Sequence, residues 1–366
     1  MVEPGAGLRG RRVLVTGHTG FKGAWLTLWL QELGAQVSGL ALAPEHPSLF
    51  ALTDLQDGLQ HHIVGDVRDI DCVDRAFRKA APEVVFHLAA QALVRQGQRE
   101  PVATFSTNIL GTVHVLDAVR RLGHTRAVVV VTTDKCYANP GDRPLQETDR
   151  LGGHGPYSAS KAAAELVTAS YRDSYFRPDQ GVFVATARAG NVLGGGDWGA
   201  DRLVPDLVRA RQCGEPCMVR SPDSVRPWQH VLEPLSGYLM LAEALLDANV
   251  SAATAFNFGP PDQGRLTVRQ LATAFDAEWD GGKGPSSHAV DPQSKGPTES
   301  AVLRLSSDKA HRLLGWTPRL SASDAIRWTA RWYRDHLSAK STTPSDTAER
   351  CRADLRAWQA AFPSPS

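Results

Sequence analysis

The sequence predicts an α/β protein with a doubly wound, Rossmann-type parallel sheet and a smaller C-terminal lobe interleaved with it. Through the first half of the chain, short apolar or β-branched runs alternate with amphipathic segments, the pattern of βα units that build a parallel sheet. The second half contains longer loop-rich stretches, such as residues 280–297 (DGGKGPSSHAVDPQSKGP), and lacks this regularity. A length of 366 residues agrees with two lobes.

Composition narrows the class of partner. The formal net charge is +1 with 22% charged residues, and no block of like charges indicates binding to nucleic acid or a membrane surface. The five cysteines are dispersed without C-x-x-C spacing, which predicts reduced thiols, no disulfide framework and no metal site. The N-terminal residues lead into a strand without a signal-peptide core, and no apolar run matches a bilayer span. We therefore expect a cytoplasmic protein with a small-molecule partner.

The first predicted unit is a strand, a glycine-rich turn and a helix. The strand RVLVT ends in the turn GHTGFKG, with G-x-x-G-x-x-G spacing, and the amphipathic segment AWLTLWLQELG follows. Such glycines let the backbone approach a pyrophosphate, and the helix N-terminus offers free N–H groups. Alone this is weak evidence, because similar turns occur by chance. The cofactor-binding candidates here are Gly17, Thr19, Gly20, Phe21, Lys22 and Gly23.

The next two predicted strands bear on which dinucleotide is bound. QVSGLAL lacks the acidic residue that commonly contacts the adenosine ribose, and residues 40–49 contain no Arg or Lys for a 2′-phosphate. We therefore expect NAD in preference to NADP, with Lys22 as a possible exception. After the strand in HHIVGDVRD, Asp66 and Val67 are candidates to hold the adenine. Alternatively, Asp66 caps the helix that begins near Asp69.

Further candidates follow the fourth and fifth predicted strands. EVVFHLAA (residues 83–90) is a continuous apolar run of the kind buried in parallel sheets, and AVVVVTTDKCY supplies the fifth strand. Because ligands of doubly wound sheets bind at the carboxyl ends of the strands, Thr132, Thr133, Asp134 and Lys135 lie where a ligand would bind. The remaining cofactor-binding candidates are Leu88, Ala89, Ala90 and, on a helix predicted over Pro101–Leu122, Asn108.

Tyr157 and Lys161 form a Tyr-x-x-x-Lys pair in PYSASKAAAELV. If this segment is helical, the two side chains share one face about a turn apart. A nearby ammonium group favours the ionised phenol and lowers its pKa, so the tyrosine can accept a proton from an alcohol. For an isolated pair, a packed tyrosine and a solvated lysine are the better interpretation. The glycine turn, the Thr-Asp-Lys at a strand end and the order of all three favour the catalytic one.

The predicted sixth strand, VFVATARAGNV, ends in Arg188 and Asn191. Loops and a smaller lobe follow, and the strand AFNFG near residues 255–259 returns to the sheet. We therefore expect a dinucleotide-binding domain over residues 1–190, a mainly substrate-binding lobe over 191–340 and a C-terminal tail over 341–366, consisting of a helix and a frayed end.

These motifs resemble the extended short-chain dehydrogenase/reductase family, and within it the CDP-glucose 4,6-dehydratases. The resemblance covers most of the chain and is carried by VLVTGHTGFKGAWLTLWLQELGA, FHLAAQALVR, TTDKCY, LGGHGPYSASKAAAELV, ARAGNVLGGGDWGADRLVPD and RPWQHVLEPLSGYL. It implies an NAD-dependent lyase that makes a 4-keto-6-deoxy sugar, with Thr133, Tyr157 and Lys161 as the oxidation group. Asp134 and Lys135 would match the acid and base of dehydration.

The resemblance also implies a nucleotide-diphosphate sugar as substrate, CDP-glucose being favoured, and we expect a homodimer. The substrate-binding candidates are Gln91, Asn191, Arg202, Arg226 and His230. A surface salt bridge is an equally good interpretation of Arg226 from the sequence alone. One segment departs from the family pattern, because the loop after Tyr137 is short and has no tryptophan. The identity of the nucleotide and the sugar therefore stays open at this point.

Three other functions remain as alternatives: an epimerase or a decarboxylase on the same scaffold, and a non-catalytic NAD-binding sensor. Asp134 and Lys135 separate the dehydratase from the epimerase, because an epimerase needs Tyr157 and Lys161 but no acid and base for C5 and C6. A sensor needs neither group.

Overall fold

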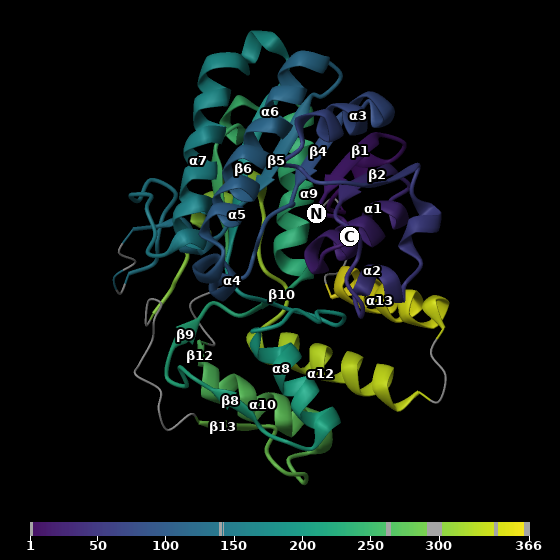
Figure 1. Cartoon of the computed structure of the whole chain (residues 1–366), viewed down its shortest axis with the longest axis vertical. Coiled ribbons are helices and arrows are strands. Elements are labelled where there is room, and N and C mark those ends of the chain that lie inside the picture. Colours follow the sequence, from purple (N-terminus) through teal and green to yellow (C-terminus); the bar gives the residue numbers. More distant parts are fainter. Residues whose placement is uncertain are drawn as a thin grey trace.

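The computed structural model describes residues 3–138, 141, 143–260, 265–290, 302–339 and 343–361. Its centre is a seven-stranded sheet with the order β11-β6-β5-β4-β1-β2-β3, and all pairs are parallel (Figure 1). The strands are β1 (Arg12–Thr16), β2 (Gln36–Ala41), β3 (His61–Val64), β4 (Val84–His87), β5 (Ala127–Val131), β6 (Phe183–Ala189) and β11 (Ala255–Phe258). Strands β1 to β6 have the order of doubly wound dinucleotide-binding sheets, so the predicted fold class is confirmed.

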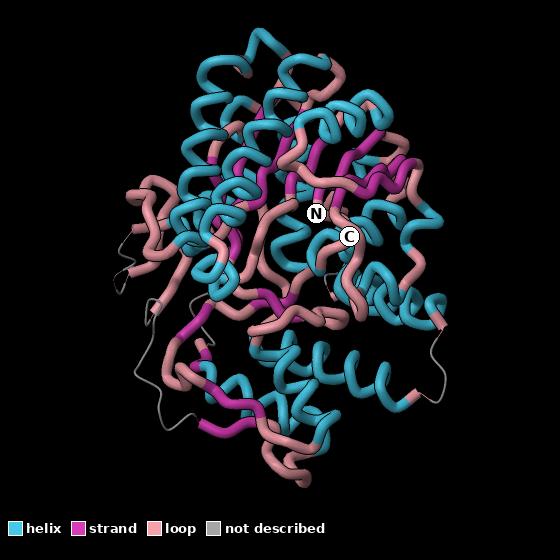
Figure 2. The backbone as a smooth tube through the Cα atoms, in the orientation of Figure 1, coloured by secondary structure: helices cyan, strands magenta, loops and turns pink. Residues whose placement is uncertain are grey.

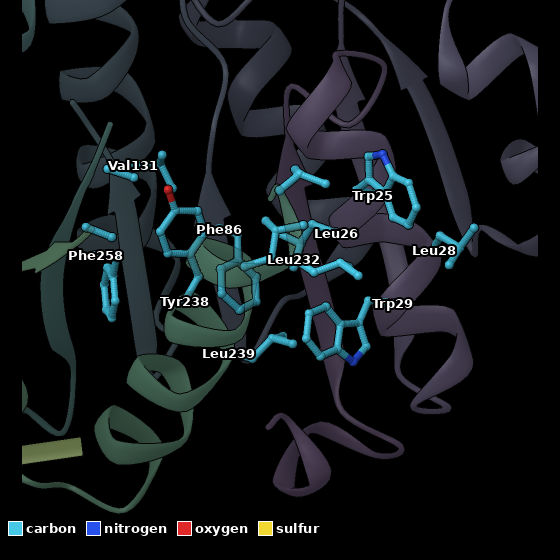
Figure 3. Close-up of a cluster of buried hydrophobic side chains, with 14 of the residues drawn as sticks. Trp25, Leu26, Leu28, Trp29, Phe86, Val131, Leu232, Tyr238, Leu239 and Phe258 are labelled. Atoms are coloured by element: carbon cyan, nitrogen blue, oxygen red, sulfur yellow. The ribbon is translucent and has the colours of Figure 1, made fainter. Parts of the chain in front are cut away.

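Helices cover both faces of this sheet. On one face lie α3 (Ile70–Ala80), α6 (Gly111–Leu122) and α7 (Pro156–Tyr175), which share a core with β4 and β5. On the other lie α1 (Phe21–Glu32) and α9 (Leu232–Leu246). Residues Gly23 to Leu30 of α1 are all buried, because this helix lies between the sheet and later helices. Figure 3 shows Trp25 and Trp29 of α1 in this core, with Phe86 of β4 and Leu232 and Leu239 of α9.

The helical stretch Pro101–Leu122 is divided into three parts. A π-helical turn, Ser106–Leu110, separates α5 (Pro101–Phe105) from α6. Among the described residues, this is the one helix long and apolar enough to cross a membrane by length and composition, a test that buried core helices also pass. The expectation that no apolar run matches a bilayer span is therefore wrong by length and composition alone. In the structure, the stretch belongs to the helical layer beside α7.

The smaller lobe lies beyond the carboxyl ends of the strands. Figure 2 shows short strand pairs and helices there, in place of a continuous sheet. β7 pairs with β10 and β8 with β13 in parallel, and β9 pairs with β12 in antiparallel fashion. Two ion pairs join α8 to α10, because Arg211 contacts Asp276 and Asp280 at 2.7 Å each. The elements are β7 (Val192–Leu193), α8 (Leu203–Cys213), β8 (Cys217–Val219), β9 (Val225–Arg226), β10 (Gln229–His230), β12 (Leu266–Thr267), α10 (Val268–Asp280) and β13 (His288–Val290).

The C-terminal helices complete the core instead of forming a tail. The structure has α11 (Asp308–Leu314), α12 (Ala322–Ser338) and α13 (Pro344–Ala360), besides the short helices α2 (Leu49–Leu52) and α4 (Val94–Arg99). Trp358 of α13 is buried, with its ring 5.1 Å from that of Trp29. Gln359 also donates a hydrogen bond to Glu3 near the N-terminus. Residues 362–366, predicted as a frayed end, and 291–301, which contain the end of the predicted 280–297 loop, lie outside the described residues.

Candidate active site

The glycine turn between β1 and α1 has the backbone geometry that a dinucleotide requires. Gly17 has φ +77°, and a Cβ there would lie 2.7 Å from the backbone nitrogen of Ala89. A Cβ on Gly23 would lie 2.0 Å from the carbonyl oxygen of Gly17. Gly20 is the N-cap of α1 without a side-chain cap, so the N–H groups of the first turn, beginning at Phe21, are available to an anion. The turn therefore fits a pyrophosphate.

The predicted adenine-binding residues lie after β3. Asp66 accepts hydrogen bonds from the backbone and guanidinium of Arg68, at 2.6 to 2.8 Å, and these bonds lower the pKa of its carboxyl. Val67 accepts a hydrogen bond from His114 Nδ1 at 2.8 Å through its carbonyl oxygen. The alternative role of Asp66 as a helix cap is wrong, because Asp69 caps α3 by accepting from two backbone N–H groups.

Asn108 and Gln91, predicted separately for cofactor and substrate, are joined by hydrogen bonds. Asn108 Oδ1 accepts from Gln91 N at 2.8 Å, and its Nδ2 donates to the Gln91 carbonyl at 3.0 Å. The same Nδ2 donates to Ser160 Oγ at 2.8 Å, next to Lys161. Asn108 is in the π-helical turn, a feature frequent at functional sites. This contact links the end of β4 to the α7 helix.

The Thr-Asp-Lys turn, residues 133–136, follows β5 and consists of the N-cap Thr133 and one 3₁₀ turn (Asp134–Cys136). Thr133 Oγ1 donates to Asp134 Oδ1 at 2.9 Å and accepts from Lys135 N at 3.3 Å. Asp134 Oδ2 is buried and has no hydrogen-bond partner within the described part of the chain. Burial raises the pKa of Asp134, although the charge of Lys135 opposes this. The carboxyl group can therefore carry a proton and aim an unused oxygen at a ligand.

Tyr157 lies in the first turn of α7, and burial raises its pKa to about 12. A hydrogen bond with Thr133 and then the charge of Arg202 oppose this rise. Lys161 Nζ donates to the Val131 carbonyl at 2.9 Å, and burial lowers its pKa to about 8. The pKa of Tyr157 therefore lies above its usual value, and not below it as expected from Lys161, because burial outweighs the opposing effects.

Lys22 lies near the candidate catalytic residues Asp134 and Lys161. Burial lowers the pKa of its ammonium to about 8, with smaller electrostatic effects from Arg202, Asp134 and Lys161. The neighbours of Lys22 therefore do not favour a role as ligand of a 2′-phosphate. A first-turn lysine near Asp134 instead adds positive charge beside the candidate catalytic residues.

Of the predicted substrate ligands, Arg202 and Arg226 have charges that act on candidate catalytic residues. Arg202 pairs with Asp197 at 2.9 Å and acts electrostatically on Tyr157. Arg226 donates to the Val225 carbonyl at 2.9 Å and acts on Asp134. Asn191, between β6 and β7, accepts a hydrogen bond from Gln229 N through its carbonyl oxygen at 3.2 Å.

His230 differs from the prediction. Its side chain has no exposed surface and lies against the rings of Trp25 and Trp328, with centroids 6.2 and 5.6 Å away. Burial lowers the pKa of the imidazole to about 3. The side chain packs in the core, because β10 turns it toward α1 and α12.

Sequence reasoning missed several residues that hold these groups in place. They are Ser160 beside Asn108, Asp197 beside Arg202, Arg68 beside Asp66, and Glu165, which accepts hydrogen bonds behind the Thr-Asp-Lys turn. Of these residues, only Glu165 could have been inferred from sequence spacing, because it follows Lys161 by four residues on the same helix face. The other contacts depend on how the chain packs.

The family model described as GDP-mannose 4,6 dehydratase matches residues 14–329. A CDP-glucose 4,6-dehydratase of Salmonella typhimurium is 44% identical over 332 residues, which are 89% of this chain and 91% of the relative.

Two solved structures have the same fold along most of their length. The UDP-glucose 4-epimerase of Thermus thermophilus in complex with NAD is 28% identical with a TM-score of 0.74, covering 88% of this chain and 99% of that one. The dTDP-glucose 4,6-dehydratase of Streptomyces venezuelae, also with NAD bound, is 26% identical with a TM-score of 0.73, covering 88% and 97%.

Proposed function

The chain belongs to the GDP-mannose 4,6 dehydratase family, and from this we propose that it is an NAD-dependent nucleotide-sugar 4,6-dehydratase. The substrate we propose is CDP-glucose and the product CDP-4-keto-6-deoxyglucose. The observation that carries the proposal is the Thr133-Asp134-Lys135 turn beside Tyr157, in a chain 44% identical to a CDP-glucose 4,6-dehydratase. The proposed reaction consumes no external oxidant.

When bound, NAD would accept the hydride from C4 of the sugar and would supply it again at C6. The glycine turn (Gly17, Gly20 and Gly23) and the N-terminus of α1 would hold its pyrophosphate, with Asp66, Val67 and Asn108 nearer its two ends. Tyr157 takes the proton of the 4-hydroxyl, and Thr133 hydrogen-bonds the same oxygen. Because burial raises the pKa of Tyr157 to about 12, its ionisation requires further positive charge, part of which Arg202 supplies.

Elimination of water follows from the ketone at C4. The carbonyl acidifies the C5 hydrogen, so Lys135 as base removes this proton and Asp134 as acid protonates the departing 6-hydroxyl. The raised pKa of Asp134, caused by burial, favours the protonated form that this role needs. When the hydride returns to C6, a proton returns to C5, so the atoms balance as substrate minus one water.

The substrate's diphosphate would bind between the two lobes. Arg202 and Arg226 support this, because a guanidinium matches phosphate oxygens and both act electrostatically on catalytic residues. Asn191 lies between β6 and β7 in the same region. The arginines enter from the smaller lobe, which supports the assignment of residues 191–340 mainly to substrate binding.

We propose a homodimer as the assembly. Apolar side chains are exposed on the neighbouring helical segments of one face: Val102, Phe105 and Leu110 along Pro101–Leu122, and Leu166 on α7. Burying such a patch against a second copy removes apolar surface from water. Light scattering should give twice the chain mass, and Leu166→Glu should reduce it to one chain mass. A monomeric unmodified protein contradicts the proposal.

A panel of nucleotide sugars tests the function. CDP-glucose, dTDP-glucose, UDP-glucose and GDP-mannose are each incubated with the protein and NAD, and the 4-keto-6-deoxy product is sought by mass and by its carbonyl chemistry. We expect product from CDP-glucose at the highest kcat/KM. If the protein instead exchanges the configuration at C4 without loss of water, it is an epimerase. This is the second candidate function, because the fold is similar to that of the Thermus thermophilus epimerase.

Cofactor choice is a separate prediction. No Arg or Lys lies within residues 40–49, and the neighbours of Lys22 are catalytic residues, so NAD should bind more tightly than NADP. Titration of both cofactors measures this. Tighter binding of NADP contradicts the prediction and leaves Arg68, next to Asp66, as a candidate for the 2′-phosphate.

A further inference from the structure

A buried ion pair lies directly behind the Thr-Asp-Lys turn. Glu165 on α7 contacts Arg188 on β6 at 2.7 Å, and both side chains are less than 5% exposed. Glu165 follows Tyr157 and Lys161 at successive intervals of four residues, so the three share one face of α7. The proposed mechanism gives neither member of this pair a role.

Glu165 holds the residue that precedes the turn. Its Oε1 accepts a hydrogen bond from Thr132 Oγ1, and its Oε2 accepts one from Thr186 Oγ1 at 2.7 Å. Thr132 is directly followed by Thr133, the first residue of the catalytic group. Thr186 is on β6, away from the turn, although it donates to the same carboxylate.

Arg188 holds the residue that follows the turn. Its Nη1 donates to Tyr137 Oη at 2.8 Å, and its guanidinium carbon lies 4.9 Å from the centre of the Tyr137 ring. Tyr137 Oη in turn donates to Asn257 Oδ1 of β11 at 2.7 Å. One ion pair thus contacts both ends of the segment that carries Thr133, Asp134 and Lys135.

We propose that the Glu165–Arg188 pair is a two-point clamp that positions the Thr-Asp-Lys turn for the elimination step. Glu165 and Arg188 are then positioning residues, since neither reaches the reacting atoms except through Thr132 and Tyr137. The inference rests on the proposed dehydratase function, because it assigns a consequence to the acid and base of that reaction.

The location of the two charges indicates that the pair positions the turn, beyond any contribution to the stability of the fold. A buried ion pair is often no more stabilising than apolar side chains of similar volume, so its presence calls for another reason. Here each charge also hydrogen-bonds one of the two residues that flank the Thr-Asp-Lys turn, Glu165 to Thr132 and Arg188 to Tyr137. Of the proposed oxidation group only Thr133 lies in the clamped turn, whereas the base Tyr157 is held by the α7 helix itself. Loosening the clamp should therefore impair elimination more than oxidation at C4.

Thr132→Val and Thr186→Val form a matched pair for the test. Each removes one hydroxyl donor to the same buried carboxylate at almost constant volume, but only Thr132 adjoins the turn. With CDP-glucose in a single turnover, Thr132→Val should accumulate reduced nicotinamide, seen in the near ultraviolet, and lose about tenfold to a hundredfold in kcat. Thr186→Val should keep kcat within about threefold of the unmodified protein and should not show this absorbance signal. Thr132→Ser, which keeps the hydroxyl donor, should restore normal turnover.

Tyr137→Phe tests the other end of the clamp and replaces Thr132→Val if that variant does not fold. It removes the oxygen that Arg188 and Asn257 share, and it should show the same absorbance signal. If the unmodified protein makes no 4-keto-6-deoxy product from any of the nucleotide sugars, both the proposed function and the clamp are overturned. If the unmodified protein makes product while Thr132→Val and Tyr137→Phe resemble Thr186→Val, the clamp alone is overturned.

Discussion

Two buried glutamates on opposite faces of the sheet are held in different ways. Glu165, behind the catalytic turn, pairs with the guanidinium of Arg188. Glu233, in the first turn of α9, accepts three hydrogen bonds from the chain that follows α11 and from α13. The donors are Arg319 N at 2.8 Å, Leu320 N at 3.0 Å and the indole of Trp358 at 2.7 Å.

The difference shows how each region uses a buried charge. A carboxylate paired with a guanidinium keeps its partners fixed, which suits a turn that must hold an acid and a base. Burial instead raises the pKa of Glu233 to about 7, despite its hydrogen bonds. The carboxyl of Glu233 joins α9 to the C-terminal helices through its three hydrogen bonds. Changes at the catalytic edge should therefore remove activity, and changes at the C-terminal closure should alter stability.

The largest effect should come from Tyr157→Phe. Only the phenolic oxygen is lost, so oxidation at C4 should fall by about a thousandfold to ten thousandfold while cofactor binding stays largely intact. Turnover of CDP-glucose and NAD titration measure the two properties, and thermal unfolding checks the fold. Normal turnover in this variant contradicts the assigned base.

Asp134→Asn and Lys135→Met should lower product formation by about a hundredfold to a thousandfold. Both should still pass hydride from C4 to NAD and then fail to lose water, so the reaction stops halfway. Near-ultraviolet absorbance of reduced nicotinamide should rise during a single turnover, whereas the unmodified enzyme shows little. Normal conversion by both variants places the elimination pair elsewhere.

The sequence predicted what depends on local pattern. Alternating apolar runs located the parallel sheet, including the return of β11, and the order of glycine turn, Thr-Asp-Lys and Tyr-x-x-x-Lys brought the candidate residues to one edge. Contacts between distant segments were not predictable in this way. Glu165 and Arg188 are 23 residues apart and Glu233 and Trp358 are 125 apart, so only tertiary packing brings them together.

Orientation within short elements was also beyond the sequence. His230 belongs to a two-residue strand, too short for its periodicity to show which way the side chain points. The last helix was assigned to a tail because the polar residues in STTPSDTAER hid the buried Cys351, Leu355 and Trp358 that follow.

The smallest effect concerns stability near neutral pH and tests Glu233 directly. The carboxyl pKa is about 7 in the folded protein against 4.5 for the unperturbed group, so the folded state holds its proton to higher pH. The contribution of this carboxyl to the free energy of unfolding is fully present below about pH 4.5 and is lost as the pH rises through 7. Between pH 6.5 and 8 this one group should lower the free energy of unfolding by about 0.8 kcal/mol.

That pH window separates Glu233 from other buried groups. Burial lowers the pKa of His18 to about 4 and of Lys161 to about 8, so their contributions change mainly below 6.5 and above 8. Glu233→Gln should flatten the dependence measured by urea unfolding at half-unit pH steps, because the amide does not titrate. Asp354→Asn is the matched control on α13: burial raises the pKa of Asp354 only to about 6, so most of the slope should remain. If Glu233→Gln keeps the full slope, another group titrates at the C-terminal closure, and the contrast between the two glutamates no longer holds.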